Sequence, residues 1–249
     1  MAEGLLLLHA FPLDARMWEP QVRALEGAVP VVAPHAPGFG GSPPSGPVLT
    51  MDEVADRAVE AALRAGVERA VVCGLSMGGY AAFRLWRRHR ERVLGLVLAN
   101  TRAVPDDQEG RERRRALAAR VLAEGVGFLA ESPPPLLSPE APEDLWRQVR
   151  ETIRAQRPEA VAAASLGMAE RPDSTPDLPG ITVPTLVITS TADALVPPEV
   201  SAAMAERIPG ARLAVLEGAG HLSNLERPEE FTELLRDHLA RCGLLPADG

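Results

Sequence analysis

The chain has 249 residues, enough for one α/β domain with a substantial buried core. Its formal net charge of −8 argues against nucleic acid as a main partner. The two cysteines, Cys73 and Cys242, neither form a disulfide framework nor show metal-ligand spacing. No apolar run approaches the roughly 20 residues that span a bilayer, and the LLLL run near the start is too short for a signal peptide. We therefore expect a cytoplasmic protein that has no membrane partner.

Apolar, strand-like runs alternate with helical patterns along the chain. Strands are expected near 4–8, 28–33, 70–75, 93–99, 184–190 and 211–217. The helix from residue 51 begins with a predicted capping box, in which Thr50 caps the N-terminus and Glu53 reaches back. The last helix is expected to open at Pro228, since proline favours the first helical position. This alternation predicts a mostly parallel sheet flanked by helices, with a site at the carboxyl ends of its strands.

Between about 101 and 178 the pattern changes to helices without intervening strands. Apolar residues recur at helical spacing over 108–130, in the segment around Trp146, and over 158–169. We expect a single domain, 1–249, with a helical cap inserted at about 102–178 that excludes water and lines a substrate pocket. Trp146 and Met168 could line that pocket, although packing inside the cap is the simpler interpretation of both.

Residues 70–80, AVVCGLSMGGY, predict a strand, a sharp turn and the start of a helix. Ser76 occupies the turn, flanked by Gly74 and Gly78, which lack the side chains that would collide where strand and helix pack closely. Unpaired N–H groups and the positive end of the helix dipole could stabilise an oxyanion beside Ser76. Taken alone, the G-x-S-x-G string also fits a glycine-rich turn without a catalytic role.

A serine nucleophile needs a base that takes its proton. Among the five histidines, only His221 lies in a glycine-rich loop between a strand-like run and the last helix. His89 and His238 fall within helical patterns and are interpreted as solvated residues on helix faces. His9 and His35 follow apolar strands. His221 is therefore the candidate base, with a structural loop histidine as the alternative.

The base in turn needs an acid that orients it. Asp193 follows the apolar run PTLVITS, which is typical of a buried parallel strand, and so lies at the carboxyl end of that strand. A turn aspartate that bonds its own backbone is the alternative interpretation. Glu217 and Asp177 are the other candidate acids.

The order Ser76, Asp193, His221, with acid and base on successive strand ends, resembles the arrangement of α/β-hydrolases. The resemblance spans nearly the whole chain and is carried by LLLLHAFPLDARMWEPQ at 5–21, VVAPHAPGFGGS at 31–42, the serine turn, PTLVITSTADALVPP and GAGHLSNLERPEEF. It implies that the backbone N–H groups of Met77 and Phe11 form an oxyanion hole. It also implies a cap inserted after the sixth strand of the family, and no cofactor or metal.

Four shorter strings, CGLSMGG, MWEPQ, LTMDEVADR and HLSN, resemble the 3-oxoadipate enol-lactonase group within that family. They say little about the substrate, which depends on the cap and the pocket walls. Where the family usually offers an aspartate, this chain has His35, which could be a pocket group or a structural loop residue. The leading antiparallel hairpin of the family is expected to be missing. The strand at 28–33 would then lie near a sheet edge, where a second subunit could pair to give a homodimer.

The sequence thus predicts a serine hydrolase of small carboxylic esters or lactones that forms an acyl-enzyme at Ser76 and uses no cofactor. One alternative keeps the three catalytic residues but performs perhydrolase or carbon–carbon bond hydrolase chemistry. Another is a non-enzymatic protein that binds a small ligand on the same fold. The acyl and alcohol parts of the substrate, and the cap residues that line the pocket, are left open.

Overall fold

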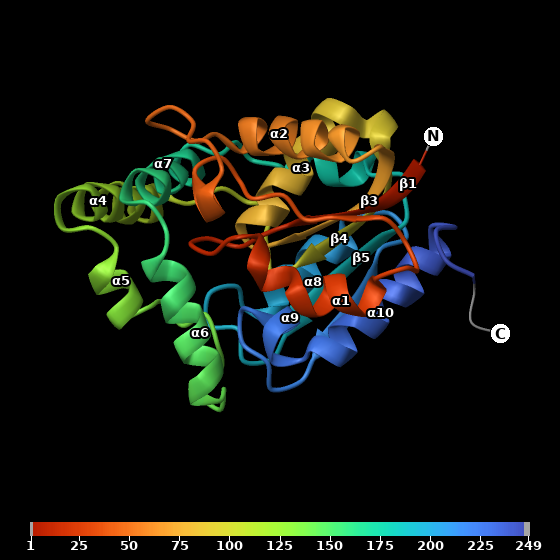
Figure 1. Cartoon of the computed structure of the whole chain (residues 1–249). Helices are drawn as coiled ribbons and strands as arrows, with labels where there is room; N and C mark the ends of the chain where they lie inside the picture. The colour runs from red at the N-terminus through yellow and green to blue at the C-terminus, as the bar shows by residue number, and fades with distance from the viewer. Residues whose placement is uncertain (1, 247–249) are drawn as a thin grey trace.

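The computed structural model describes residues 2–246, which contain a six-stranded sheet with helices on both faces (Figure 1). The strands are β1 (Ala2–Leu8), β2 (Val31–Val32), β3 (Val67–Leu75), β4 (Val93–Ala99), β5 (Thr185–Ser190) and β6 (Arg212–Leu216). Their order across the sheet is β2-β1-β3-β4-β5-β6, and each neighbouring pair is parallel. The parallel sheet is confirmed, and each predicted strand has a counterpart, although the one expected near 28–33 is only Val31–Val32.

The sheet is covered by helices that connect its strands. The α-helices are α1 (Glu19–Leu25), α2 (Met51–Arg64), α3 (Met77–His89), α4 (Gln108–Glu124), α5 (Gly127–Glu131), α6 (Glu143–Arg154), α7 (Pro158–Ala169), α8 (Pro198–Glu206), α9 (Ser223–Glu226) and α10 (Pro228–Arg241). Short 3-10 turns are η1 (Ala15–Trp18), η2 (Phe39–Gly41), η3 (Arg90–Arg92) and η4 (Thr175–Gly180). In Figure 1, α2 and α3 lie above the sheet, and α1 and α10 lie below it.

The middle of the sheet is buried on both faces. Leu6 of β1 is in register with Val32 of β2 and with Val72 of β3. Because helices cover both sides of these strands, the run from Leu5 to Leu8 is apolar at every position instead of alternating. Cys73 is also buried in β3, and burial raises the pKa of its thiol. The edges differ, since β2 has only two residues at one of them and β6 lies at the other.

The start of α2 differs in part from the predicted capping box. Thr50 Oγ1 accepts a hydrogen bond from the N–H of Glu53 at 3.1 Å, as expected. The Glu53 carboxylate, however, accepts a hydrogen bond from Ser45 Oγ at 2.6 Å. The Glu53 side chain therefore bonds to the loop before α2, whereas the predicted capping box had it reach back to the N-terminus of the helix. The predicted start of the last helix at Pro228 is confirmed.

Helices α4 to α7 form the long connection between β4 and β5. Figure 1 shows them gathered on the left, beyond the carboxyl ends of the strands. The stretch expected as one helix over 108–130 is divided into α4 and α5 at Gly125, whose φ of 77° lies in the left-handed region that glycine favours. Met168 is buried in α7 and Trp146 is half-buried on α6.

A buried charge cluster fastens the two ends of this connection together. Asp106, just before α4, contacts Arg102 at 2.9 Å, Arg114 at 2.5 Å and Arg171 at 2.9 Å. Arg171 comes after α7, and its guanidinium also lies 4.1 Å from the ring centroid of Tyr80 on α3. The cluster thus joins the beginning and the end of the connection to the helix that follows β3.

Gln156, in the short connection between α6 and α7, makes a second set of buried contacts. The Gln156 amide donates to Asp14 Oδ2 at 2.8 Å and accepts from the N–H of Gly40 at 3.1 Å. Asp14 also receives the guanidinium of Arg16 at 2.7 Å. Burial alone would raise the pKa of Asp14, but the hydrogen bonds from Arg16 and Gln156 outweigh it and lower the pKa to about 2. An ionised aspartate therefore holds the inserted helices against the loop after β1.

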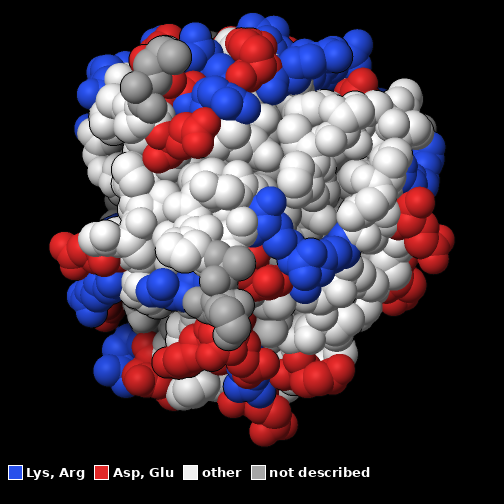
Figure 2. All heavy atoms as spheres, turned by 90° about the vertical axis from the view of Figure 1, so that its right-hand side faces the viewer, with Lys and Arg blue, Asp and Glu red and all other residues white. Residues whose placement is uncertain are grey.

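Figure 2 shows the face near the two chain ends. Basic and acidic side chains both occur there, around a broad area of residues without formal charge. That face therefore does not carry a charge of one sign. Among the helices of residues 2–246, none is long and apolar enough to cross a membrane.

Candidate active site

Ser76 lies in a sharp turn between β3 and α3. Its φ of 56° and ψ of −113° are unusual for a residue with a side chain, and the close packing of the surrounding glycines holds them. A Cβ at Gly74 would lie 2.2 Å from the carbonyl oxygen of Gly78, and a Cβ at Gly78 would lie 2.1 Å from that of Leu8. Both glycines are therefore required for the reason that the sequence indicates.

The same packing brings the start of α3 against the end of β1, where the loop containing Phe11 begins. Met77 is the first residue of α3, so its N–H has no acceptor within the helix. Within residues 2–246, no acceptor bonds the backbone N–H of Met77 or of Phe11. An oxyanion hole requires two such unpaired donors beside the nucleophile, and this role of Met77 and Phe11 stays a prediction.

Asp193 and His221 form a buried pair beyond the carboxyl ends of β5 and β6. His221 Nδ1 lies 2.9 Å from Asp193 Oδ2 and 3.1 Å from Oδ1. The side chain of His221 is 2% exposed and that of Asp193 is 0% exposed. Because the carboxylate can only accept, this contact assigns the proton of a neutral imidazole to Nδ1 and leaves Nε2 as the basic nitrogen.

Backbone and side-chain donors surround the Asp193 carboxylate. Its Oδ1 accepts from the N–H groups of Leu195 at 2.8 Å and Val196 at 2.9 Å, and its Oδ2 accepts from Asn100 Nδ2 at 2.9 Å. Burial alone would raise the pKa of Asp193, but the contact with His221 and these hydrogen bonds outweigh it and lower the pKa. The acid is therefore held as an anion facing the imidazole.

Asn100 is a site residue that the sequence analysis missed. It follows β4, is fully buried and has a φ of 45°. Besides Asp193 it contacts Ser190 Oγ at 2.7 Å and accepts from Ser223 Oγ at 2.6 Å. Ser190 Oγ in turn donates to the carbonyl of Gly220 at 2.6 Å. A polar residue at the carboxyl end of a buried parallel strand is a signal that could have identified Asn100.

Strand order places Ser76 beside this network. The N–H of Ser76 donates to the carbonyl of Ala99 at 3.0 Å, and Thr101 Oγ1 donates to the carbonyl of Ser76 at 2.8 Å. The segment that carries Asn100 therefore lies between the serine turn and the acid. Within residues 2–246, no hydrogen bond joins Ser76 Oγ to His221. Such catalytic contacts often tighten only when substrate binds.

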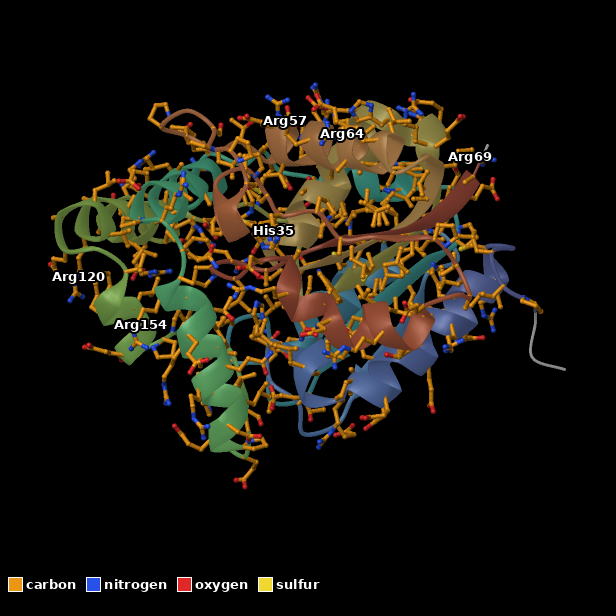
Figure 3. All side chains as sticks on the ribbon, viewed as in Figure 1. His35, Arg57, Arg64, Arg69, Arg120 and Arg154 are labelled. Atoms are coloured by element: carbon orange, nitrogen blue, oxygen red, sulfur yellow. The ribbon has the colours of Figure 1, made fainter. Side chains whose placement is uncertain are left out.

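His9 and His35 connect loops. His9 Nε2 accepts from the N–H of Ala36 at 2.9 Å, and burial lowers the pKa of His9 to about 4, so the ring is neutral. His35 Nδ1 accepts from the N–H of Ala15 at 3.2 Å, and its ring packs directly against Gly40. Figure 3 shows His35 toward the middle of the molecule, below α2 in that view. These contacts favour the structural interpretation of His35 over the pocket interpretation.

The expectation for His238 is wrong. This residue is 1% exposed on α10, and burial lowers its pKa to about 4. It packs under the sheet near Gly95, where a Cβ would lie 3.2 Å from its Nε2. His89 is half-buried and lies 2.7 Å from Asp56. Its contact is therefore an ion pair with α2 when the ring is protonated.

The other candidate acids lie elsewhere. Asp177 faces Arg87 at 3.4 Å, and Glu217 is exposed after β6. In the described part of the chain, Asp193 is the only carboxylate that bonds the His221 ring. Over the same residues, no group of three or more histidine, cysteine, aspartate and glutamate side chains is arranged to hold a metal ion.

Comparison with known proteins gives relatives over almost the entire chain. A family model described as the alpha/beta hydrolase family matches residues 5–234. A pimeloyl-[acyl-carrier protein] methyl ester esterase from Aromatoleum aromaticum is 30% identical and covers 94% of this chain and 96% of its own length. An enzyme of the same name from Neisseria meningitidis is also 30% identical, over 93% of this chain and 91% of its own.

Solved structures agree with these relatives. A thermophilic esterase from Thermogutta terrifontis, with malate bound, is 43% identical with a TM-score of 0.92, over 97% of this chain and 92% of that one. An enol-lactonase from Burkholderia xenovorans is 31% identical with a TM-score of 0.87, over 96% and 92%. The predicted resemblance to esterases and lactonases is confirmed. The prediction that the protein is an enzyme of the carboxylic ester hydrolase type is also confirmed. The chain belongs to the alpha/beta hydrolase family.

Proposed function

We propose that this enzyme hydrolyses small carboxylic esters or lactones with Ser76 as nucleophile, His221 as base and Asp193 as the acid that orients the base. The observation that carries the proposal is the buried Asp193–His221 pair, with the ring proton of His221 on Nδ1. The pair lies at the carboxyl ends of the strands, where the strained serine turn also lies. Family membership supports ester hydrolysis, and the residue roles are inferred from this geometry.

In the first half of the reaction, Ser76 Oγ attacks the carbonyl carbon of the ester while His221 Nε2 takes the hydroxyl proton. The negative charge that develops on the carbonyl oxygen is stabilised by the N–H groups of Met77 and Phe11. Asp193 stabilises the imidazolium that forms. As the carbon–oxygen bond breaks, His221 returns its proton to the leaving alkoxide, and the acyl group stays on Ser76.

In the second half, water attacks the acyl-enzyme. His221 takes a proton from the water and then gives it to Ser76 Oγ as the acyl–serine bond breaks, which releases the carboxylic acid. The same oxyanion donors act in both halves. No step needs a redox partner.

We assign residues 102–178 to a cap over the carboxyl ends of the strands. Support comes from the position of α4 to α7 in Figure 1 and from the contact of Leu222, next to His221, with the carbonyl of Leu136 at 2.8 Å. Such a cap would exclude water from the reacting ester and set the shape of the pocket.

The substrate class rests on the relatives. Two of them are named for the methyl ester of pimeloyl-acyl carrier protein, and another is an enol-lactonase. Methyl esters, lactones and acyl esters of varied chain length are therefore the classes to screen.

The test is turnover of purified protein on these three classes. We expect Ser76→Ala to lower kcat by about 10⁴-fold or more, because the whole covalent route is lost. The control is Ser132→Ala, at an exposed serine between α5 and α6. A fluorophosphonate probe should label the wild type at Ser76. Retention of most activity by Ser76→Ala would overturn the assignment. Product analysis with and without peroxide separates hydrolysis from perhydrolysis.

A further inference from the structure

The carboxylate of Glu226 lies between two segments that are far apart in the sequence. Glu226 is the last residue of α9, and its Oε1 accepts from the N–H of Gly220 at 2.8 Å. Both carboxylate oxygens also lie 3.1 Å from the N–H of Ser138, and Oε2 accepts from Ser138 Oγ at 2.5 Å. Ser138 belongs to the connection between α5 and α6. One side chain thus joins this connection to the loop that carries His221.

The two segments touch closely on both sides of His221. A Cβ at Gly220 would lie 2.3 Å from the backbone nitrogen of Ser138, so only glycine fits there. On the other side, the N–H of Leu222 donates to the carbonyl of Leu136 at 2.8 Å. The residues that flank His221 are therefore both held by residues 136–138.

Burial makes the carboxylate hard to replace. Ser138 is 2% exposed and Gly220 is buried, so water does not readily substitute for a lost acceptor. Three donors converge on Glu226, namely two backbone N–H groups and one hydroxyl. A carboxylate offers enough acceptor positions for all three, whereas an amide offers one accepting oxygen and a nitrogen that can only donate.

We propose that Glu226 is a positioning residue for His221. Its carboxylate holds the His221 loop against residues 136–138, so the alignment of the base depends on the seating of the inserted connection. This proposal rests on the proposed function, because it assumes that His221 is the base. It predicts that weakening the contact slows the chemical step more than it weakens substrate binding, since neither Glu226 nor Ser138 needs to touch the substrate.

The test compares three variants with a matched control. Glu226→Ala removes all three contacts. Glu226→Gln keeps one accepting oxygen but places an amide nitrogen against a donor. Ser138→Ala removes only the hydroxyl contact. The control is Glu229→Gln, at an exposed residue in the first turn of α10.

We expect Glu226→Ala to lower kcat by about 10-fold or more with KM changed by less than about 3-fold, because hydrogen bonds to a charged group are lost. Glu226→Gln and Ser138→Ala should follow with smaller losses of kcat in that order. The rate at which a fluorophosphonate labels Ser76 should fall in parallel, because labelling also needs the base. Circular dichroism and melting midpoints confirm that each variant is folded.

Folded Glu226→Gln and Ser138→Ala variants with kcat and labelling rates equal to those of the wild type would overturn the proposal, even if Glu226→Ala fails to fold. A loss confined to KM would also overturn it, as would an equal loss of kcat in Glu229→Gln. Failure of the proposed function looks different, because the wild type itself would then show neither turnover nor labelling at Ser76.

Discussion

Replacing Asn100 tests how the acid of the proposed mechanism is held. Its amide nitrogen contacts Asp193 at 2.9 Å and Ser190 at 2.7 Å, while its amide oxygen accepts from Ser223 at 2.6 Å. Because the backbone at Asn100 has a φ of 45°, glycine is the substitution that removes these contacts without adding backbone strain. We expect Asn100→Gly to lower both activity and stability.

The size of the effect follows from the contacts. A hydrogen bond to a charged group contributes about 1.5–3 kcal/mol, and the bond to Asp193 is of that kind. If it is lost in full from the transition state, kcat/KM falls by roughly 10- to 150-fold at about 1.36 kcal/mol per tenfold change. With one donor fewer, the pKa of the buried Asp193 carboxyl should also rise toward its ordinary value. Asn100→Ala should destabilise the fold by about a further 1–2 kcal/mol, because alanine resists positive φ.

The assay is ester hydrolysis between pH 5 and 9 together with urea unfolding of the same samples. The glycine variant reports the lost contacts, and the difference between alanine and glycine in the free energy of unfolding reports the backbone. An Asn100→Gly protein with the kcat/KM and the free energy of unfolding of the wild type would refute the assigned role of Asn100.

Three further expectations concern the buried carboxylates. Gln156→Ala should lower the free energy of unfolding by about 1–3 kcal/mol in urea, since Asp14 loses a donor; no change would contradict this. The pKa of Asp14 is lowered from 3.8 to about 2, so its stabilisation is complete above pH 3.8 and is lost as the pH falls through 2. As the pH falls over this range, the free energy of unfolding should drop by about 2 kcal/mol in the wild type, and this drop should be missing in Asp14→Asn. Asp106→Asn should cost about 3–5 kcal/mol, because it leaves three arginines without their anion, and calorimetry checks it.

The serine turn was predictable because its requirements are local. Gly74, Ser76 and Gly78 are close in sequence, and the collision that Gly74 avoids is with Gly78 in the helix that follows. The collision that Gly78 avoids is with Leu8 of β1, which is distant in sequence. Asp193 and His221 were predictable as a pair for a similar reason. Each follows its own strand, and β5 and β6 are neighbours both in the chain and in the sheet.

The network around Asn100 was not predictable in this way. Asn100 and Ser190 are separated by 90 positions, and Asn100 and Ser223 by 123. Their contact depends on β4 lying between β3 and β5, which is a property of the assembled sheet. A polar Asn100 after β4 is a weak local signal, and its meaning comes from the partners that folding supplies.

The burial of His238 was indicated by its position in the apolar period of α10, although its polarity was used to predict a solvated face. Phe231, Leu235 and Leu239 recur at helical spacing and are fully buried, and His238 lies on the same stripe of α10. Its polarity suggested a solvated face, whereas its position in the period indicated the core. Position in the apolar period was the stronger guide here, because the helix buries this face against the sheet whatever single residue it carries.

Glu226 combines both situations. It lies in the string HLSNLE that begins with His221, so its nearness to the base was visible in the sequence, but Ser138 is 88 positions away. The inserted helices differ from the sheet in that no strand pairing holds them. Their seating therefore comes from isolated backbone hydrogen bonds, such as that from Leu222 to Leu136, and from side-chain contacts such as those of Gln156 and Glu226. If residues 102–178 form the proposed cap and Glu226 acts as we propose, the segment that shapes the substrate pocket also aligns the base. Exchanging the cap without its partner on the His221 loop would then lower kcat as well as change substrate choice.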